Sequence, residues 1–440
     1  MPSMLETLDP AGGIRCATPL LQAARLSGRL PPSVIVVGAG VVGVATAYAL
    51  ARRGASVTLV DRETQPGQGT SFANGAQLSY LYTDALANPS LLKRAPGLLL
   101  GLEPAFRLQP SLDPAYLWWL LRFLRNATPA RFRAHTLAGL QLGLESRVAM
   151  AALLAAHPLD FGHAVSGKLH VHDSPESLAS AAELVALKRQ HGAEQELLTA
   201  AEACALEPAL HSRSGSFAGA VYTPQDAVGD PFRFCGGLLA LLERSYGVTA
   251  RLGDAVAQVE LTPWQARLHL RSGEVLAAEQ VVVCAGADSG KLLAEYGLRS
   301  ALQPMKGYSF TAPPGSACPK VSITDVARKL VFCQLEGRVR VAGLAELGSF
   351  DRTVIPSRLD YLVTTAREAL PLAAVYSEAG QPWAGLRPMT PTSLPIVRQV
   401  QPRLAVNMGH GMLGWTFAMG SAERLADVML GVAVSGQQPA

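Results

Sequence analysis

The sequence predicts an α/β protein with at least two domains, and three observations support this fold class. The chain has 440 residues, about three times the usual length of a single domain. Hydrophobic residues make up 49% of the chain and charged residues only 16%, which favours a large apolar interior and excludes a disordered chain. An apolar, β-branched run at residues 33–37 leads through a glycine-rich turn into a helical pattern and a second apolar run, as in a parallel sheet covered by helices.

Charge and cysteine content narrow the class of protein. Lys and Arg number 38 and Asp and Glu number 34, so the net charge is +4, and the basic residues are scattered. Nothing therefore favours nucleic-acid binding. The six cysteines lie far apart and form no C-x-x-C pair, so we expect a reduced, cytoplasmic chain without a metal site. His170 and His172 would share a strand face, but two ligands do not make a metal site, and we interpret this segment as a solvated strand.

The N-terminal region predicts neither a membrane span nor a secretory signal. No apolar run reaches the ~18 residues that a membrane-spanning helix needs. The first residues lack a basic stretch followed by an apolar one, which a secretory signal would have. We interpret residues 1–32 as a loose leader that precedes the fold.

The first element of the fold begins at Ser33. Residues 33–37 read Ser-Val-Ile-Val-Val, as expected of a strand that is buried on both faces. A helix with small residues on its inner face follows and ends at Gly54. A second strand at residues 56–60 ends at Asp61. These elements predict a β-α-β unit.

The turn between this strand and helix has the spacing of a dinucleotide-binding site. It reads Gly38-Ala39-Gly40-Val41-Val42-Gly43. Gly38 permits the tight turn, Gly40 lets the backbone approach a pyrophosphate, and Gly43 lets the helix pack closely on the strand. The helix N-terminus offers N–H groups and a positive dipole to the phosphates, and Asp61 can accept hydrogen bonds from a ribose diol.

Three further segments decide between NAD and FAD. After Asp61 the chain enters a glycine-rich loop and residues 70–77, instead of the regular βα units of an NAD dehydrogenase. The buried strand predicted at 281–284 leads into Ala285 and Gly286, whose small size permits the close approach of a cofactor. Residues 407–415 form a glycine-rich entry to a helix, which would direct backbone donors at the anionic pyrimidine side of a reduced flavin. Together these segments favour FAD.

These segments, with residues 304–309 and 383–391, resemble the FAD-dependent amine oxidoreductases of the D-amino acid oxidase type, a family that includes glycine oxidase. Within it the sequence is most similar to the bacterial D-amino acid dehydrogenases of the small-subunit type. The resemblance extends from about Ser33 to Gly431. The chain departs from the family pattern at Gly75-Ala76, at Thr392, where an Asp is usual, and at Met412, where a smaller residue is usual. These departures bear on substrate preference more than on reaction class.

The resemblance implies a Rossmann-type FAD-binding domain interleaved with an α+β substrate domain, which has a mixed antiparallel sheet and helices. The expected FAD-binding domain comprises residues 33–87, 224–299 and 399–436, and the substrate domain comprises residues 88–223 and 300–398.

Periodicity places further elements within these domains. Helical patterns fall at 114–125, 136–156, 176–191 and about 416–429. Residues 331–334 and 338–341 flank a turn as a hairpin, and residues 253–259 alternate as a strand.

The resemblance also implies a set of cofactor-binding residues in and around the glycine-containing segments. They are Gly38, Ala39, Gly40, Val42, Gly43, Asp61, Arg62, Thr70, Ser71, Asn74, Gly75, Gln77, Val256, Ala285, Gly286, Gly409, Gly411, Met412, Leu413 and Gly414. Relatives with a covalent flavin attach it through a C-terminal cysteine or an N-terminal histidine. Because no cysteine follows Cys333 and no histidine precedes His135, we expect the FAD to be noncovalent.

Three residues are candidates for the chemistry. Arg387 matches the arginine that binds the substrate carboxylate in the family, and a guanidinium fork fits a carboxylate. Tyr308 matches a position that borders the substrate, although a buried structural tyrosine explains it almost as well. His410 is expected to shape the flavin loop, with a general-base role as the less favoured interpretation.

The implied reaction is the oxidative deamination of D-amino acids to 2-oxo acids and ammonia. A hydride would pass from Cα to flavin N5, and the electrons would go to a quinone or another respiratory acceptor. The alternative is an amine oxidase of the glycine or sarcosine type that uses oxygen. An FAD-containing subunit for assembly or tRNA modification would need an added domain or a basic face, and neither is visible in the sequence.

The segment Tyr116–Arg125 leaves two interpretations open. It combines Trp118 and Trp119 with Arg122 and Arg125, as helices at a membrane interface do. An ordinary substrate-domain helix would bury the same aromatic residues. We expect a cytoplasmic protein, with peripheral contact to the cytoplasmic face of the inner membrane as the open alternative.

Overall fold

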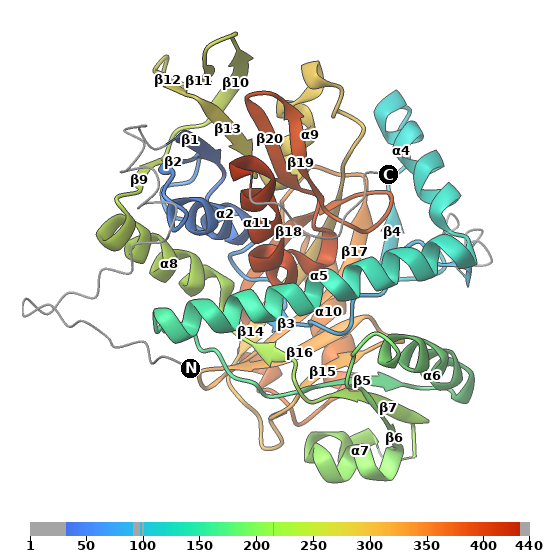
Figure 1. Ribbon diagram of the computed structural model, residues 1–440. Coiled ribbons are helices and arrows are strands. Elements are labelled where there is room, and N and C mark those ends of the chain that lie inside the picture. The colour runs from blue at the N-terminus through green and yellow to red at the C-terminus, as the bar shows by residue number, and fades with distance from the viewer. Residues whose placement is uncertain (1–31, 91–96, 99–100, 214, 432–440) are drawn as a thin grey trace, which may run out of the picture.

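The computed structural model of the protein describes residues 32–90, 97–98, 101–213 and 215–431. Apart from residue 32, the predicted leader lies outside the described residues, as do residues 432–436 of the predicted FAD-binding domain. Figure 1 shows two sheets, one in the upper and one in the lower half of the view, with the long helix α5 running across the middle.

The upper sheet has six strands in the order β19-β20-β13-β1-β2-β9, and its neighbours are parallel except for β19 and β20. The strands are β1 (Ser33–Val37), β2 (Ser56–Asp61), β9 (Thr249–Leu252), β13 (Gln280–Val283), β19 (Ile396–Gln401) and β20 (Leu404–Met408). The predicted β-α-β unit is confirmed: β1 pairs with β2 in parallel, and α2 (Val41–Ala51) connects them.

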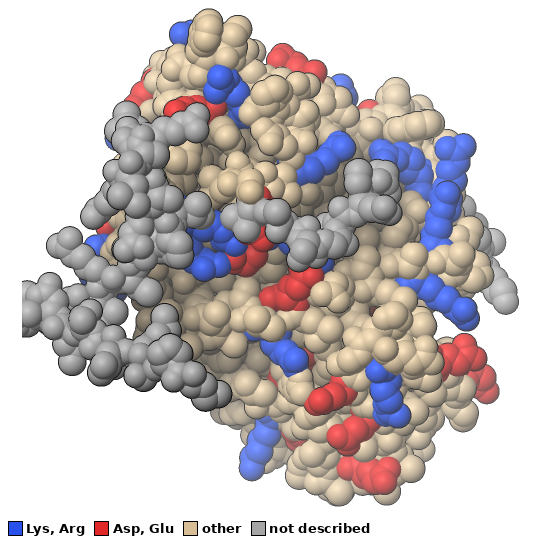
Figure 2. Space-filling model, viewed as in Figure 1, with Lys and Arg blue, Asp and Glu red and all other residues tan. Residues whose placement is uncertain are grey.

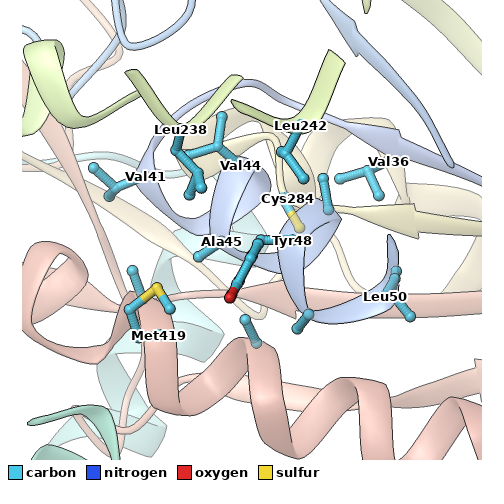
Figure 3. Packing of buried hydrophobic residues seen from close by; sticks show 14 of the residues in the cluster. Val36, Val41, Val44, Ala45, Tyr48, Leu50, Leu238, Leu242, Cys284 and Met419 are labelled. Atoms are coloured by element: carbon cyan, nitrogen blue, oxygen red, sulfur yellow. The ribbon is translucent and has the colours of Figure 1, made fainter. Parts of the chain in front are cut away.

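Strand β1 is buried on both faces, as its sequence predicts. Val34 and Val36 belong to the core beside α2, α8 (Pro231–Tyr246) and α11 (Gly414–Leu430), part of which Figure 3 shows. Ile35 and Val37 belong to a second core that faces the small antiparallel sheet of β10 (Val256–Leu261), β11 (Ala266–Leu270) and β12 (Val275–Ala278). The sheet therefore lies between a layer of helices and a smaller sheet.

The lower sheet has nine strands in the order β18-β14-β17-β16-β15-β5-β7-β6, with β4 beside β17. They are β4 (Phe106–Leu108), β5 (Lys168–His172), β6 (Glu196–Thr199), β7 (Gly219–Thr223), β14 (Gln303–Ala312), β15 (Ser322–Asp325), β16 (Leu330–Leu335), β17 (Arg338–Leu347) and β18 (Gly380–Met389). Most neighbours are antiparallel, but β15 pairs with β5 and β17 with β4 in parallel, so the sheet is mixed as expected. A separate two-stranded ladder joins β3 (Gln77–Leu78) to β8 (Ala227–Val228).

The remaining α-helices surround the two sheets. They are α4 (Pro114–Asn126), α5 (Pro129–Ala156), α6 (Pro175–Arg189), α7 (Ala200–Leu206), α9 (Ser289–Leu292) and α10 (Pro356–Ala369). The predicted helices and the β16–β17 hairpin are confirmed, with α5 starting earlier than expected because Thr128 caps it ahead of a proline. The predicted strand at 253–259 begins only at Val256, since Gly253 has a φ of 87°.

Helix α5 has no uninterrupted apolar run long enough to span a membrane, because Glu145 and Arg147 lie within it, but its length and average composition resemble those of a membrane span. Its most apolar stretch has a mean hydropathy of 1.3, and 39% of that stretch is buried in the protein. Its glycines pack tightly: a Cβ at Gly143 would lie 2.2 Å from the carbonyl oxygen of Tyr80. Gly420 of α11 approaches Leu142 and Ser146 of α5 in the same way. In this fold α5 is a core helix.

The interpretation of residues 170–172 as a solvated strand was wrong. All five residues of β5 are buried, because β5 lies between β15 and β7 inside the nine-stranded sheet. The ring of His170 stacks on Tyr82 with 3.6 Å between centroids. His172 accepts or donates a hydrogen bond at Nδ1 with the Ser177 hydroxyl of α6, 2.8 Å away.

The predicted domain boundaries stay a prediction. The strands of the six-stranded sheet fall in the segments assigned to FAD binding, except that β19 starts at Ile396, before the predicted boundary. Helix α5 was assigned to the substrate domain, but its Met150 and Leu153 belong to the core around α2 and α11.

Candidate functional site

A cavity of about 1170 Å³ lies between the two sheets and brings together most of the predicted site residues. It begins at the carboxyl ends of β1, β2 and β13, where open α/β sheets bind their ligands. From there it extends to β14, β17 and β18 of the nine-stranded sheet. Its volume exceeds that of a typical small-molecule pocket, roughly 300–1,000 Å³, and leaves room for a dinucleotide and a second ligand.

Steric contacts explain why two of the three glycines of the first turn are glycines. Gly38 has a φ of 107°, and a Cβ there would lie 2.5 Å from the carbonyl oxygen of Cys284. A Cβ at Gly43 would lie 1.7 Å from the carbonyl oxygen of Gly38, so only glycine lets α2 pack this closely. Gly40 is the N-cap of α2 and lines the cavity with Val42, whereas Ala39 and Gly43 lie behind them. The positive end of α2 therefore opens onto the cavity.

Two side chains complete this turn. The hydroxyl of Ser71 accepts a hydrogen bond from the N–H of Val41, 3.1 Å away, and so caps α2 from a distant loop. The carboxylate of Asp61 accepts hydrogen bonds from the N–H groups of Ala39 and Glu63. Burial raises the pKa of Asp61. Asp61 also lines the cavity at the end of β2, where the ribose of a dinucleotide is expected.

Near Asp61, a network of ion pairs lines the same cavity. Asp288, which follows β13, accepts both ion pairs at its Oδ2 atom. The Nη1 atom of Arg62 lies 2.9 Å away, and the Nη2 atom of Arg352, in the loop after β17, lies 3.3 Å away. Val256, Ala285 and Gly286 line this part as predicted.

The loop of residues 70–77 connects the two halves of the site. The Thr70 hydroxyl donates to the carbonyl oxygen of Leu386 at 2.8 Å, next to Arg387. Asn74 accepts at Oδ1 from the N–H of Ala76, which has a φ of 57°. A Cβ at Gly75 would contact Val331 at 3.3 Å.

Gln77 turns away toward β15. Its side-chain amide donates to the hydroxyl of Ser322. All of the predicted residues of this loop line the cavity: Thr70, Ser71, Asn74, Gly75 and Gln77.

The C-terminal glycine loop forms the opposite wall. Gly409 and Gly411 have φ values of 82° and 56°, and a Cβ at Gly409 would lie 2.4 Å from Thr390. The backbone of His410 bridges to Met389 of β18. Met412 is half exposed, and it lines the cavity with Leu413 and Gly414 before α11 begins.

His410 is a structural residue of this loop. Its side chain is buried, and its Nε2 lies 2.9 Å from the hydroxyl of Ser421 in α11. Burial lowers the pKa of His410 to about 3, so the ring is neutral at pH 7. The side chain joins the glycine loop to α11, and the predicted role of His410 in shaping the flavin loop stays a prediction.

Arg387 lies in the cavity wall and has one hydrogen bond, from Nη1 to the carbonyl oxygen of Leu344 at 2.9 Å. Within the part of the chain that the structure describes, no carboxylate forms an ion pair with it. Burial lowers the pKa of Arg387 to about 10, which leaves it charged at neutral pH. A desolvated guanidinium that has only a carbonyl partner is suited to bind an anion.

The structure does not bring Tyr308 and Arg387 together. In the β14–β18 ladder Met305 pairs with Arg387 and Tyr308 pairs with Ala384, so the two side chains leave opposite faces of the sheet. Tyr308 itself lines the cavity, but its hydroxyl donates to Glu346 at 3.2 Å within the core beneath α10. This geometry agrees with the structural interpretation of Tyr308.

A buried group of charges was missed by the sequence analysis. Lys168 and Lys188 line the cavity and are almost fully buried, near the equally buried Asp226. Lys188 pairs with Asp84 at 2.8 Å, and Lys168 donates to the Ser79 hydroxyl at 2.5 Å. Burial lowers the pKa of Lys168 and raises that of Asp226. These residues come from distant segments, so no local pattern could have revealed them.

Metal chemistry has no candidate site in the described ranges, where no group of three or more His, Cys, Asp and Glu side chains could hold an ion. The residues that line the cavity do fit a flavin dinucleotide. A side chain at Gly40 would intrude between the helix end and Ser71. Farther along, the Oδ1 atom of Asn407 lies buried at the cavity wall, without a hydrogen-bond partner among the described residues.

The fold and the cavity together define a flavin-dependent oxidoreductase. Residues 33–428 match the model of the DAO family, described as FAD dependent oxidoreductase, and the chain belongs to this family. The protein is therefore an FAD-dependent oxidoreductase, as the sequence predicts.

Several curated proteins are similar over nearly the whole chain. "D-amino acid dehydrogenase 2" of Ralstonia nicotianae is 42% identical over 407 residues, which are 90% of this chain and 96% of that protein. "D-amino acid dehydrogenase" of Paramagnetospirillum magneticum is 39% identical over 404 residues, which are 90% of this chain and 95% of that protein.

Solved structures share the fold at low sequence identity. Glycine oxidase from Geobacillus kaustophilus has a TM-score of 0.71 at 21% identity and covers 92% of this chain and 97% of its own. L-proline dehydrogenase from P. horikoshii has a TM-score of 0.72 at 16% identity, covering 92% of this chain and 95% of its own. The expected fold class, a Rossmann-type FAD-binding part combined with a mixed-sheet part, is confirmed.

Proposed function

We propose that the protein is a D-amino acid dehydrogenase. It would oxidise a D-amino acid to the 2-imino acid, which water hydrolyses to a 2-oxo acid and ammonia, and pass the electrons to a quinone of the respiratory chain. The observation that carries this proposal is the buried guanidinium of Arg387. It is charged, and no carboxylate of the described chain pairs with it. It lines the same cavity as the glycine-rich turn at Gly38 and Gly40. The names of the relatives at 42% and 39% identity support the substrate class.

Arg387 would bind the substrate carboxylate. Its Nη1 atom donates to Leu344, which holds the side chain in one orientation and leaves other N–H groups for the ligand. Two parallel hydrogen bonds would fix both the position and the rotation of the carboxylate. The amino acid would then have one orientation in the cavity, which is how a positioning residue lowers a barrier.

Residues of β14 and β18 surround the side chain of Arg387. Gly307 lies beneath the guanidinium, Trp383 covers Gly385, and Met305 lies beside Arg387 on the neighbouring strand. The loop that begins at Gly409 faces them from the FAD-binding side. When bound, FAD would supply the two-electron acceptor for the hydride that leaves Cα.

The chain's own residues position the substrate and need not accept a proton. His410 is neutral and committed to Ser421, and the Tyr308 hydroxyl is committed to Glu346. Once the substrate ammonium has lost a proton to water, transfer of a hydride from the neutral amine requires no protein base. The absence of a catalytic dyad near Arg387, among the described residues, is consistent with this mechanism.

The test is anaerobic reduction of the purified holoenzyme by a panel of D- and L-amino acids, glycine and sarcosine, followed by reoxidation with air or with a ubiquinone analogue. We expect D-amino acids to bleach the flavin and the quinone to reoxidise it much faster than oxygen does. Bleaching by glycine or sarcosine, with hydrogen peroxide formed at the turnover rate, would instead identify an amine oxidase. Bleaching by L-amino acids alone would contradict the proposed handedness.

A further inference from the structure

Helix α4 separates the cavity from the molecular surface and has two different faces. Trp119 and Phe123 on the inner face are buried and line the cavity. The indole N–H of Trp119 donates to the carbonyl oxygen of Met389, 3.0 Å away. The helix is therefore fixed to β18, the strand that carries Arg387.

The outer face of α4 is apolar and exposed. Its side chains are 46%, 50%, 41% and 38% exposed at Leu117, Trp118, Leu121 and Leu124, respectively. Their spacing places them along one side of the helix. The sequence alone leaves open whether the two tryptophans are buried or interfacial. In the structure Trp119 is buried and Trp118 is exposed. An exposed apolar stripe of this kind indicates an interaction surface.

The charged side chains along this stripe are basic, apart from Asp113 at the N-cap of α4. Arg122 and Arg125 on α4 and Arg131 and Arg133 at the start of α5 are exposed, and residues 114–144 contain no Asp or Glu. The acid at the helix start, Asp113, lies 3.5 Å from Arg299. Figure 2 shows Lys and Arg side chains gathered over α4 and the nearby end of α5, at the right of the view.

From this complementarity we propose that the outer face of α4 docks the protein on an anionic lipid bilayer. Trp118 and the three leucines would enter the interface, and the four arginines would contact the lipid phosphates. An amphipathic helix that combines Trp and Leu with arginines binds lipid surfaces in this way, and each arginine near an anionic surface strengthens binding about five-fold.

Docking on α4 would also place one lobe of the cavity beside the lipid. The cavity wall beside α4 includes Phe106, Trp119 and Phe123, which pack together with Met305 and Met389. Arg387 lines the same cavity. A lipid-soluble quinone could enter there, a consequence that rests on the proposed function. The bilayer expected is the cytoplasmic leaflet of the inner membrane, whose anionic lipids attract basic surfaces.

The experiment is flotation of the holoenzyme with phosphatidylcholine vesicles that contain or lack phosphatidylglycerol. We expect binding only when phosphatidylglycerol is present, and weaker binding at high salt. The double variant Arg122→Glu and Arg125→Glu should reduce partitioning by about 25-fold or more, and Leu121→Glu should also abolish it. Trp264→Ser and Arg244→Glu, at exposed positions elsewhere, are matched controls and should bind like the wild type.

Flavin content and anaerobic reduction by amino acids should be unchanged in all these variants, because none of them lines the cavity. Vesicle binding therefore tests the docking proposal, and flavin reduction tests the proposed function independently of it. Absence of binding to anionic vesicles, equal binding to neutral vesicles, or binding that the α4 substitutions leave intact would overturn the proposal. So would a dimer that Leu121→Glu dissociates, since the stripe would then be covered by a second copy of the chain.

Discussion

The guanidinium of Arg387 lies directly over the Cα atom of Gly307 on the neighbouring strand. A Cβ built at residue 307 would come within 2.3 Å of Nη2 and 2.5 Å of Cζ of Arg387. The space that glycine leaves in β14 is therefore the space that the arginine occupies. Because Nη1 donates to Leu344 on the next strand, three strands of the nine-stranded sheet fix the orientation of this one side chain.

Gly307→Ala should displace Arg387 without removing it. We expect kcat/KM for amino acids to fall by roughly 10–100-fold, because a shift of about 1 Å in a positioning group costs rate on this scale. The flavin content should stay normal. Gly236→Ala in α8, where a Cβ would meet nothing within 4 Å, is the matched control. Steady-state kinetics decide the matter, and unchanged kinetics in Gly307→Ala would show that the arginine is free to move.

Tyr308→Phe distinguishes a structural tyrosine from a substrate contact. The variant loses the hydrogen bond to Glu346, so we expect unfolding to be easier by about 1–3 kcal/mol, since a buried carboxylate loses a partner. The values of kcat and KM should stay within about two-fold of the wild type. Thermal unfolding and steady-state kinetics measure the two effects. A large loss of kcat/KM at unchanged stability would place the phenol in the substrate site after all.

Asp61→Asn should loosen the cofactor. The carboxylate accepts N–H groups at the turn and lines the cavity, and a hydrogen bond to a charged group contributes about 1.5–3 kcal/mol. We expect FAD to dissociate from the holoenzyme roughly 10–100-fold faster. Glu243→Gln, an exposed position on α8, is the control. Flavin fluorescence after dilution reports the rate, and an unchanged rate would mean that Asp61 supports only the turn.

His410 predicts a specific dependence of stability on pH. Its pKa is about 3 in the folded protein and about 6.5 in the unfolded chain. Between these values the unfolded state binds the extra proton. The stabilising contribution is therefore complete above pH 6.5 and is lost, by about 1.4 kcal/mol per pH unit, as the pH falls toward 3.

His410→Gln should make the free energy of unfolding less sensitive to acid. Comparing urea unfolding of the wild type and the variant at pH 6.5 and pH 5, we expect the wild type to lose about 2 kcal/mol more than the variant. Equal losses would show that the ring is already protonated or exposed in the folded protein.

The parts of the structure that depend on residues close together in the sequence could be predicted from local patterns. The β-α-β unit from Ser33 to Asp61 follows from the hydrophobic pattern and the glycine spacing. In the structure β1 pairs with β2, and the glycines make the close contacts that the turn requires. The position of Arg387 in the cavity wall follows from its motif. The direction of Tyr308 does not, because the face that it occupies depends on the pairing of β14 with β18.

Contacts between distant segments escaped prediction. His170 and His172 alternate like residues of a solvated strand, and only the neighbouring strands and Tyr82 bury them. The helix cap at Val41 comes from Ser71, thirty residues away in a loop that has no regular pattern. Lys168 and Asp226 become neighbours because β5 pairs with β7, which ends three residues before Asp226, so neither looks unusual in the sequence.

The most direct test of the account is the rate of anaerobic flavin reduction in the wild type, Arg387→Ala and Arg387→Lys, measured by stopped flow at increasing concentrations of a D-amino acid. Loss of one partner of a buried charge pair costs about 2–5 kcal/mol. Both variants should therefore retain FAD but be reduced at least about 30-fold more slowly at low substrate, and the lysine should not restore the fork. The same rates in a primary amine without a carboxylate should differ little between the three proteins. If either variant were reduced by the amino acid as fast as the wild type, Arg387 would not hold the carboxylate, and the central claim would be wrong.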